Sequence, residues 1–108
     1  MAETGSGDVD LTMVTMELDA ADATRVQAIL ARYVVLSRGH EGCRNIDLAL
    51  SSTTPERFVI IQKWESPEAQ RRHFDSSDMV EMAEACRGLL TRAPRIDLLH
   101  PISAHDLG

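Results

Sequence analysis

Hydrophobic residues recur with two different spacings in the first part of the sequence, and each spacing predicts one kind of element. Residues 11–18 alternate in part between apolar and polar side chains, which is typical of a strand. Within residues 26–34 the apolar positions fall three or four apart, which predicts an amphipathic helix. Asp19 or Asp22 can cap the start of this helix, and Gly39 can leave its end with a positive φ angle. The first two predicted elements are therefore a strand and a helix.

Two strands joined by a hairpin loop are expected next. Residues 44–50 and 58–65 have strand-like patterns, and the loop over residues 51–56 is rich in Ser, Thr and Pro. Because successive side chains point to opposite faces of a strand, the second of these strands has two apolar faces. One face carries Phe58, Ile60 and Trp64, and the other carries Val59 and Ile61.

The helical pattern then returns in two pieces. Ser66 suits the N-cap of the first piece, and Pro67 suits its first position, where a missing N–H costs nothing. The polar residues 75–77 interrupt the helix and can cap the second piece, which is expected to end at Pro94, before a fourth strand over residues 96–102. The apolar stripe of the second piece consists of Met79, Met82, Ala83, Cys86, Leu89 and Leu90.

The order strand, helix, strand, strand, helix, strand predicts an α+β, ferredoxin-like βαββαβ domain over residues 11–102. Its four-stranded antiparallel sheet would carry the helices on one face. The other face of the sheet would then expose apolar side chains, so we expect a homodimer in which two sheets pair and form a dimeric α/β barrel. Residues 1–10 are expected to be a disordered lead-in, and residues 103–108 a C-terminal tail.

Composition narrows the range of partners. The 108 residues include 11 basic and 17 acidic residues, a net charge of −6, which disfavours nucleic acid and anionic membrane surfaces. No apolar run reaches the length of a membrane span, and the polar start is unlike a signal peptide. The two cysteines form no CxxC pair, so reduced thiols in a cytoplasmic protein are expected. His40 and Glu41 lack the spacing of a metal site, and we expect no metal.

Several local motifs resemble the antibiotic biosynthesis monooxygenase domains of the dimeric α/β-barrel superfamily. The resemblance covers most of residues 11–102 and includes His73 before a Ser-Asp break. The other matching segments are Glu41-Gly42-Cys43, Arg57-Phe58-Val59, Trp64-Glu65-Ser66-Pro67-Glu68-Ala69, and Leu98-Leu99 shortly before Pro101.

The resemblance implies a small oxygenase that acts on a quinol or polycyclic phenol with O2 and needs no cofactor. Trp64 matches a tryptophan that lines the pocket of such members, whereas Ile60 stands where they have an asparagine. The family also contains heme-degrading enzymes. In one version of these, the position equivalent to Met82 is the iron-ligating histidine, and His73 falls where they have a second tryptophan, so heme degradation is not expected.

Six residues are the candidates for the site. His73 and Trp64 are the candidate catalytic residues, and the candidate substrate contacts are Ile60, Gln62, Tyr33 and Met82. Triplet O2 reacts slowly with neutral closed-shell molecules, whereas a deprotonated phenol is a good one-electron donor to O2. A base whose pKa lies near the working pH suits that first step, and His73 is the candidate.

Each candidate also has a purely structural interpretation. Trp64, Tyr33 and Met82 suit a core, and His73 suits an exposed helix end. Two other functions remain open on the same fold. One is a non-catalytic dimeric protein that binds a ligand or responds to stress, and the other is an isomerase that uses His40 or His73 as acid and base.

Overall fold

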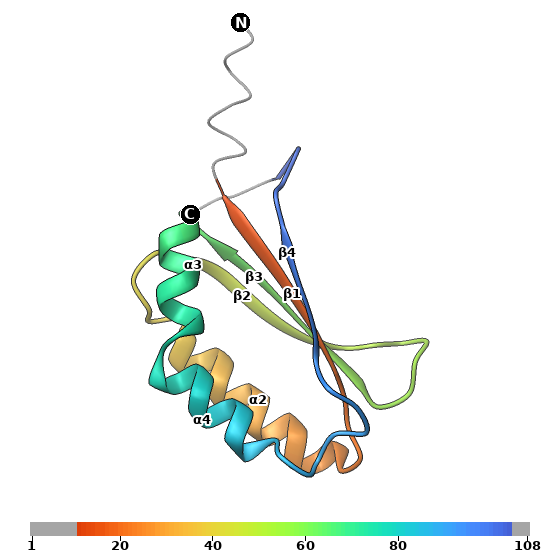
Figure 1. The fold of residues 1–108 in the computed structure, drawn as a ribbon. Helices are drawn as coiled ribbons and strands as arrows, with labels where there is room; N and C mark the ends of the chain where they lie inside the picture. Colours follow the sequence, from red (N-terminus) through yellow and green to blue (C-terminus); the bar gives the residue numbers. More distant parts are fainter. Residues whose placement is uncertain (1–10, 105–108) are drawn as a thin grey trace, which may run out of the picture.

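A computed structural model describes residues 11–104 of the chain. Within that range the chain forms four strands and three helices in the predicted order (Figure 1). The elements are β1 (Thr12–Asp19), α2 (Ala23–Ser37), β2 (Cys43–Leu50), β3 (Arg57–Trp64), α3 (Pro67–Phe74), α4 (Ser77–Ala85) and β4 (Arg95–Leu99). The expected lead-in over residues 1–10 lies outside the described residues, as does most of the expected C-terminal tail.

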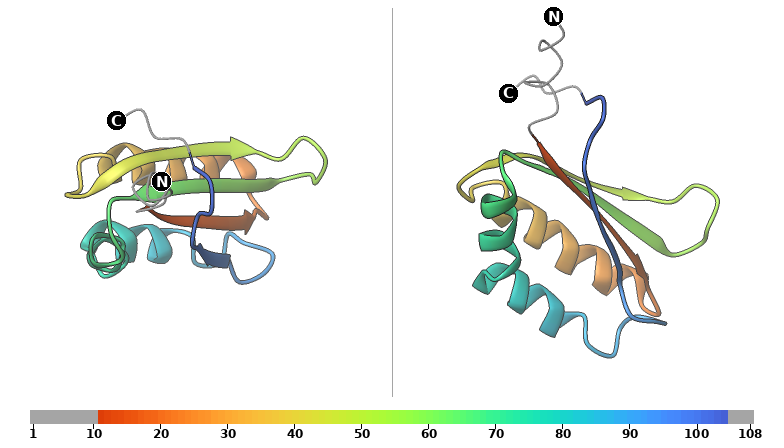
Figure 2. Two further views of the ribbon diagram at one scale, coloured as in Figure 1. Left: turned by 90° about the horizontal axis from the view of Figure 1, so that it is seen from above. Right: turned by 45° about the horizontal axis from the view of Figure 1, so that its top comes forward.

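The strands form one antiparallel sheet in the order β2-β3-β1-β4, which confirms the α+β, ferredoxin-like fold. All three helices lie against the same face of the sheet, with α2 and α4 side by side (Figures 1 and 2). β1 and β3 occupy the centre, and the side chains that alternate along them form the floor of the core. Those buried side chains are Val14, Met16, Leu18, Phe58, Ile60, Gln62 and Trp64.

Side-chain caps fix where the helices begin. The Asp22 carboxylate accepts a hydrogen bond from the N–H of Arg25 and thereby caps α2, as the sequence predicts. Ser66 caps α3, with Pro67 in its first turn, and Ser76 caps α4 across the predicted break. Since α3 carries His73 and α4 begins at Ser77, four residues later, the two short helices place their side chains close to one another.

The end of α2 differs from the prediction in one respect. Gly39 does not take a positive φ angle; among the described glycines, Gly42 (φ 84°) and Gly88 (φ 80°) do. α2 ends at Ser37, and its C-cap is Arg38, whose guanidinium donates two hydrogen bonds to the Ile46 carbonyl on β2. The residue with a positive φ angle is therefore Gly42, three residues later than expected, because the side chain of Arg38 first bonds the helix end to the sheet.

The last helix and the last strand are both shorter than predicted. α4 ends at Ala85, because backbone groups of the next segment bond to the end of β1 instead of extending the helix. Ala21 N–H donates to the Leu89 carbonyl, and Thr91 N–H donates to the Asp19 carbonyl. β4 ends at Leu99, opposite Met13, two residues before Pro101, which has no N–H to donate to a neighbouring strand.

The open face of the sheet is more mixed than the pattern of β3 predicts. Ile61 and Leu99 are exposed apolar side chains on this face, with Met13 and Val59 partly buried beside them. Leu99 pairs with Met13, whereas the cross-strand neighbours of Ile61 are the polar residues Thr15 and Asp47. Polar residues on β1 and β2 thus divide the expected apolar patch.

Candidate functional site

A row of hydrogen-bonded polar side chains runs through the core between the sheet and the helices. Trp64 Nε1 donates to Gln62 Oε1 at 2.8 Å, and Gln62 Nε2 donates to the Tyr33 hydroxyl at 3.0 Å. The Tyr33 hydroxyl lies 2.6 Å from His73 Nε2. All four side chains are buried, so each depends on the others for its hydrogen bonds.

The row continues from His73 to the protein surface. His73 Nδ1 lies 2.8 Å from His40 Nδ1, and His40 Nε2 lies 2.8 Å from Asp78 Oδ2. The side chains of His40 and Asp78 are 21% and 25% exposed, so this end of the row meets solvent. Six residues from five segments of the chain thus form one row from the core to the surface, which we call the polar row: Trp64, Gln62, Tyr33, His73, His40 and Asp78.

The chemistry of its two ends gives the polar row a direction. An indole N–H can only donate, so Gln62 Oε1 accepts and Gln62 Nε2 donates to Tyr33. A carboxylate can only accept, so His40 carries its proton on Nε2 and leaves Nδ1 free to accept from His73. His73 Nε2 then accepts from the Tyr33 hydroxyl. Every hydrogen bond in the row therefore points from Trp64 toward Asp78.

Burial keeps the middle of the row neutral. Desolvation, and next the neighbouring His40, lowers the pKa of His73 to about 4, while Asp78 acts in the opposite direction. Desolvation also raises the pKa of Tyr33 to about 12. At neutral pH the two groups are thus an imidazole that accepts and a phenol that donates, which agrees with the direction of the hydrogen bonds. The pKa of His73 therefore lies below the near-neutral value that the sequence leads one to expect of the base.

Trp64 fixes the orientation of the His73 ring. The two rings stack with centroids 4.5 Å apart and an interplanar angle of 30°. Trp64 has no exposed surface and His73 is 3% exposed, so neither ring has space to turn. His73, expected on one interpretation at an exposed helix end, is a core residue held on three sides.

An apolar cavity of about 460 Å³ lies beside the polar row, between α4 and the β1–β4 side of the sheet. Two arginines, Arg87 and Arg92, are the charged residues of its lining. Met16 joins the cavity to the row, because Gln62 Nε2 donates to the Met16 sulfur at 3.4 Å. The lining residues that belong to the core are Met16, Leu18, Met79, Met82 and Cys86, with Leu90 and Ile96 partly buried against them.

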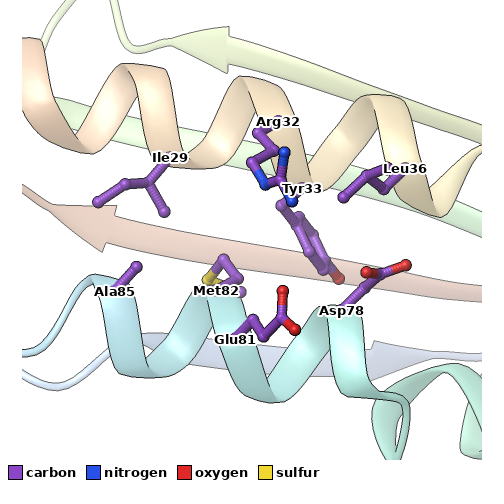
Figure 3. Close-up of a pocket in the computed structure, with 8 residues that line it drawn as sticks. All are labelled: Ile29, Arg32, Tyr33, Leu36, Asp78, Glu81, Met82 and Ala85. Atoms are coloured by element: carbon purple, nitrogen blue, oxygen red, sulfur yellow. The ribbon is translucent and has the colours of Figure 1, made fainter.

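A smaller hollow of about 160 Å³ separates α2 from α4 (Figure 3). Tyr33 and Leu36 reach it from α2, and Asp78 and Met82 reach it from α4 (Figure 3). Two members of the polar row therefore line this hollow, and Met82 lines both spaces.

Four of the six predicted site residues, Trp64, Gln62, Tyr33 and His73, meet in the polar row. Met82 lines both cavities, whereas Ile60 is packed in the core and borders neither. The sequence indicates His40 only as an acid or base of the alternative isomerase, and it does not point to Asp78 or Met16 as members of this site. His40 and Asp78 are 38 residues apart in the sequence, and no local pattern indicates that they meet.

Within the described range, no group of three or more His, Cys, Asp or Glu side chains is arranged to hold a metal ion. Cys43 and Cys86 are free thiols, and burial raises the pKa of each, which disfavours the thiolate that a nucleophile requires. None of the helices in residues 11–104 combines the length and apolarity needed to cross a membrane.

Solved structures of other proteins share this fold over most of their length. Rv0793 from Mycobacterium tuberculosis superimposes with a TM-score of 0.80 at 23% identity, covering 91% of this chain and 99% of that one. PA3566 from Pseudomonas aeruginosa superimposes with a TM-score of 0.78 at 22% identity, covering 87% of this chain and 96% of that one. SnoaB, a cofactor-independent oxygenase from Streptomyces nogalater, superimposes with a TM-score of 0.74 at 18% identity, covering 83% of this chain and 91% of that one.

The comparison with family models identifies the family. No curated protein matches the chain. A model described as antibiotic biosynthesis monooxygenase matches residues 11–85, which span every element from β1 to α4 and all six members of the polar row. The chain belongs to the antibiotic biosynthesis monooxygenase family.

Proposed function

We propose that this protein is a cofactor-independent monooxygenase that oxidises a quinol or polycyclic phenol with O2. The observation that supports it most is the hydrogen bond from Gln62 Nε2 to the Met16 sulfur at the wall of the large cavity. A thioether is a weak acceptor. A substrate oxygen that displaced this sulfur would give the buried amide a better partner and would lie next to the Tyr33 hydroxyl.

The cavity suits an aromatic substrate of more than one ring. Its volume of about 460 Å³ lies within the range of small-molecule sites. An apolar cavity of about 150 Å³ is enough to hold benzene. The cavity thus has space for roughly three rings, and its methionines can adapt to a flat apolar surface.

The polar row provides a route for the substrate proton. The Tyr33 oxygen accepts one hydrogen bond from Gln62 and has a second lone pair for the hydroxyl of the substrate. As Tyr33 accepts that proton, it passes its own to His73 Nε2, 2.6 Å away. Gln62 then donates to the phenolate, and Trp64 keeps His73 in place by stacking.

The phenolate supplies the electrons for the reaction with O2. One electron passes from the phenolate to O2, the two radicals combine to a peroxide at a ring carbon, and the peroxide breaks down. For a CH2 carbon in the ring, one oxygen atom remains as a carbonyl and the other leaves as water. The proton removed at the start returns in that water, so the protein gains and loses no net proton.

Oxygen uptake with a panel of anthrones and hydroquinones, in buffer free of metal and flavin, tests the proposal. We expect turnover by the native protein and a loss of about 10²-fold or more in His73→Ala and Tyr33→Phe. His100→Ala, which changes an exposed histidine outside the row, should retain full activity. Turnover by the native protein no higher than that of His73→Ala and Trp64→Ala would contradict the proposal.

A non-catalytic ligand-binding protein is the second candidate, and one observation favours it. The Cys86 thiol is the one polar group among the core side chains of the described cavity lining, and the polar row lies behind Met16. If binding is the whole function, an anthrone should bind with the same affinity to the native protein and to Tyr33→Phe, without oxygen uptake.

We also propose that the protein is a homodimer whose open sheet faces pair. The partly apolar centre of this face, around Ile61 and Leu99, supports the proposal. Two copies related by a two-fold axis would cover these side chains.

A further inference from the structure

The contact between the two histidines in the polar row limits where protons can lie. With the two Nδ1 atoms 2.8 Å apart, one proton fits between them. With a proton on each Nδ1 atom, the two N–H groups would collide. With no proton between the two nitrogen atoms, their lone pairs would face and repel each other. The pair therefore holds one shared proton, and adding a proton at one side requires the loss of one at the other.

The surface end of the pair has an acceptor that can exchange protons with water. Asp78 accepts from His40 Nε2, and its side chain is 25% exposed. Besides each other, the titratable groups that face the two rings are Asp78 from α4 and Tyr33 from α2. Cys43 on β2 lies close enough to act on Tyr33.

From this geometry we infer that His40 and Asp78 are the solvent end of a proton relay, through which the proton taken up by His73 reaches the surface and returns. The inference rests on the proposed function. His73 gains the Tyr33 proton at Nε2 and releases its own from Nδ1 to His40 Nδ1. His40 in turn releases the proton on Nε2 to Asp78.

The relay explains how a buried imidazole acts as a base without becoming a buried cation. A proton that stayed on His73 would create a charge in a site where desolvation disfavours it. Transfer along the row keeps each imidazole neutral and changes the charge at Asp78 alone. When the peroxide breaks down to carbonyl and water, the proton returns along the same path and restores both tautomers.

Nitrogen-15 NMR of the histidine rings tests the relay without depending on turnover. At neutral pH we expect His73 to carry its proton on Nδ1 and His40 on Nε2. Asparagine at position 78 still accepts a hydrogen bond from His40 but takes up no proton. Asp78→Asn should therefore keep both tautomers and slow the exchange of the His73 Nδ1 proton with solvent. The opposite tautomers, or equal exchange rates in the two proteins, would overturn the inference.

Kinetics test the same relay in the reaction. Asp78→Asn should lower kcat by about 10²-fold with KM unchanged and increase the solvent deuterium isotope effect. Asp78→Ala should lower kcat by a similar factor, and added formate should restore part of the lost activity. Glu84→Gln, an exposed carboxylate on the same helix, should behave as the native protein does.

The two sets of results separate the two proposals. If the native protein shows no turnover on any phenol but has the expected tautomers and exchange rates, the proposed function fails and the relay stands. If turnover occurs and Asp78→Asn leaves kcat and the isotope effect unchanged, the relay is wrong and the proposed function stands.

Discussion

Burial changes His73 from an ordinary titrating imidazole into a neutral group that connects two others. It accepts from the Tyr33 hydroxyl, contacts His40 and stacks on Trp64. A histidine near the end of a short helix is usually exposed, so its position in the sequence gives little sign of this role. The role follows from the row of partners that surround it in the folded chain.

The stability of the protein should depend on pH through His73. Its pKa is about 4 in the folded protein and about 6.5 in the unfolded chain. Between these values the unfolded state binds more protons, so stability increases with pH. The contribution of His73 is complete above about pH 6.5, declines as the pH falls to 4, and changes no further below that. The loss over this range should be roughly 3 kcal/mol.

Urea denaturation at a series of pH values measures this dependence. His73→Gln should be less stable near neutral pH. Between pH 6.5 and 4 its free energy of unfolding should also lack the part of the pH dependence that His73 causes. His100→Gln should keep the slope of the native protein, since His100 is exposed. A native protein whose stability is flat across this range would show that His73 titrates normally.

At the scale of elements, the approach of α3 to the turn before β2 brings the two histidines together. Gly42 lies in that turn with φ 84°, and a Cβ there would lie 2.5 Å from the Cβ of Ala69 on α3. The Gly42 carbonyl also accepts a hydrogen bond from the Glu65 N–H at 2.8 Å. The absence of a side chain at Gly42 therefore lets α3 lie close to the segment that carries His40.

Three glycine-to-alanine variants separate backbone strain from steric overlap. Gly42→Ala should cost about 2–5 kcal/mol of stability, because it combines a left-handed conformation with overlap against Ala69. Gly88→Ala should cost about 1–2 kcal/mol, since its φ is 80° and no atom lies within 4 Å of the new Cβ. Gly39→Ala should change stability by less than about 0.5 kcal/mol.

Thermal or urea unfolding gives the order of the three variants. Histidine NMR adds a second measurement, since displacement of α3 in Gly42→Ala should disturb the His40–His73 contact while Gly88→Ala leaves it intact. Equal losses in Gly42→Ala and Gly88→Ala would mean that Ala69 moves away at little cost.

The secondary structure was predicted best where local chemistry decides it. The caps at Asp22, Ser66 and Ser76 satisfy N–H groups within their own first turns, so the pattern of nearby residues reveals them. The end of α4 was predicted wrongly. The apolar residues Leu89 and Leu90 continue its pattern, but their backbone groups contact the end of β1 instead.

At the scale of the whole molecule, the sheet has one face that the helices cover and one that they leave open. The open face carries Ile61, whose side chain is 37% exposed, among charged and polar neighbours. Pairing of two such faces would bury apolar and charged groups together. The arrangement of those charges would fix the register of a dimer.

Ile61→Lys should weaken the dimer by about 2 kcal/mol or more, because pairing of the two faces would have to desolvate two ammonium groups near its centre. Val80→Lys is the control, since Val80 is exposed on α4, away from the sheet. Light scattering across a range of concentrations should show a dimer for the native protein and Val80→Lys, and a monomer for Ile61→Lys. A native protein that is a monomer at micromolar concentration would contradict the proposed pairing.

The sequence by itself determined the order of the elements, the ferredoxin-like fold and the family. These depend on periodicity, caps and short motifs, which are properties of neighbouring residues. It also selected Trp64, Gln62, Tyr33 and His73, because residues on one face of β3 and residues on the helices above it are expected to meet.

Only the tertiary structure decided how those residues are connected. His40 and Asp78 join the row across 38 residues of sequence, through contacts that depend on the packing of α3 and α4 and on the close approach at Gly42. The direction of the hydrogen bonds and the neutrality of His73 likewise follow from burial and from specific partners. Hydrogen bonding and desolvation depend on which atoms meet, and the order of residues along a chain does not specify that.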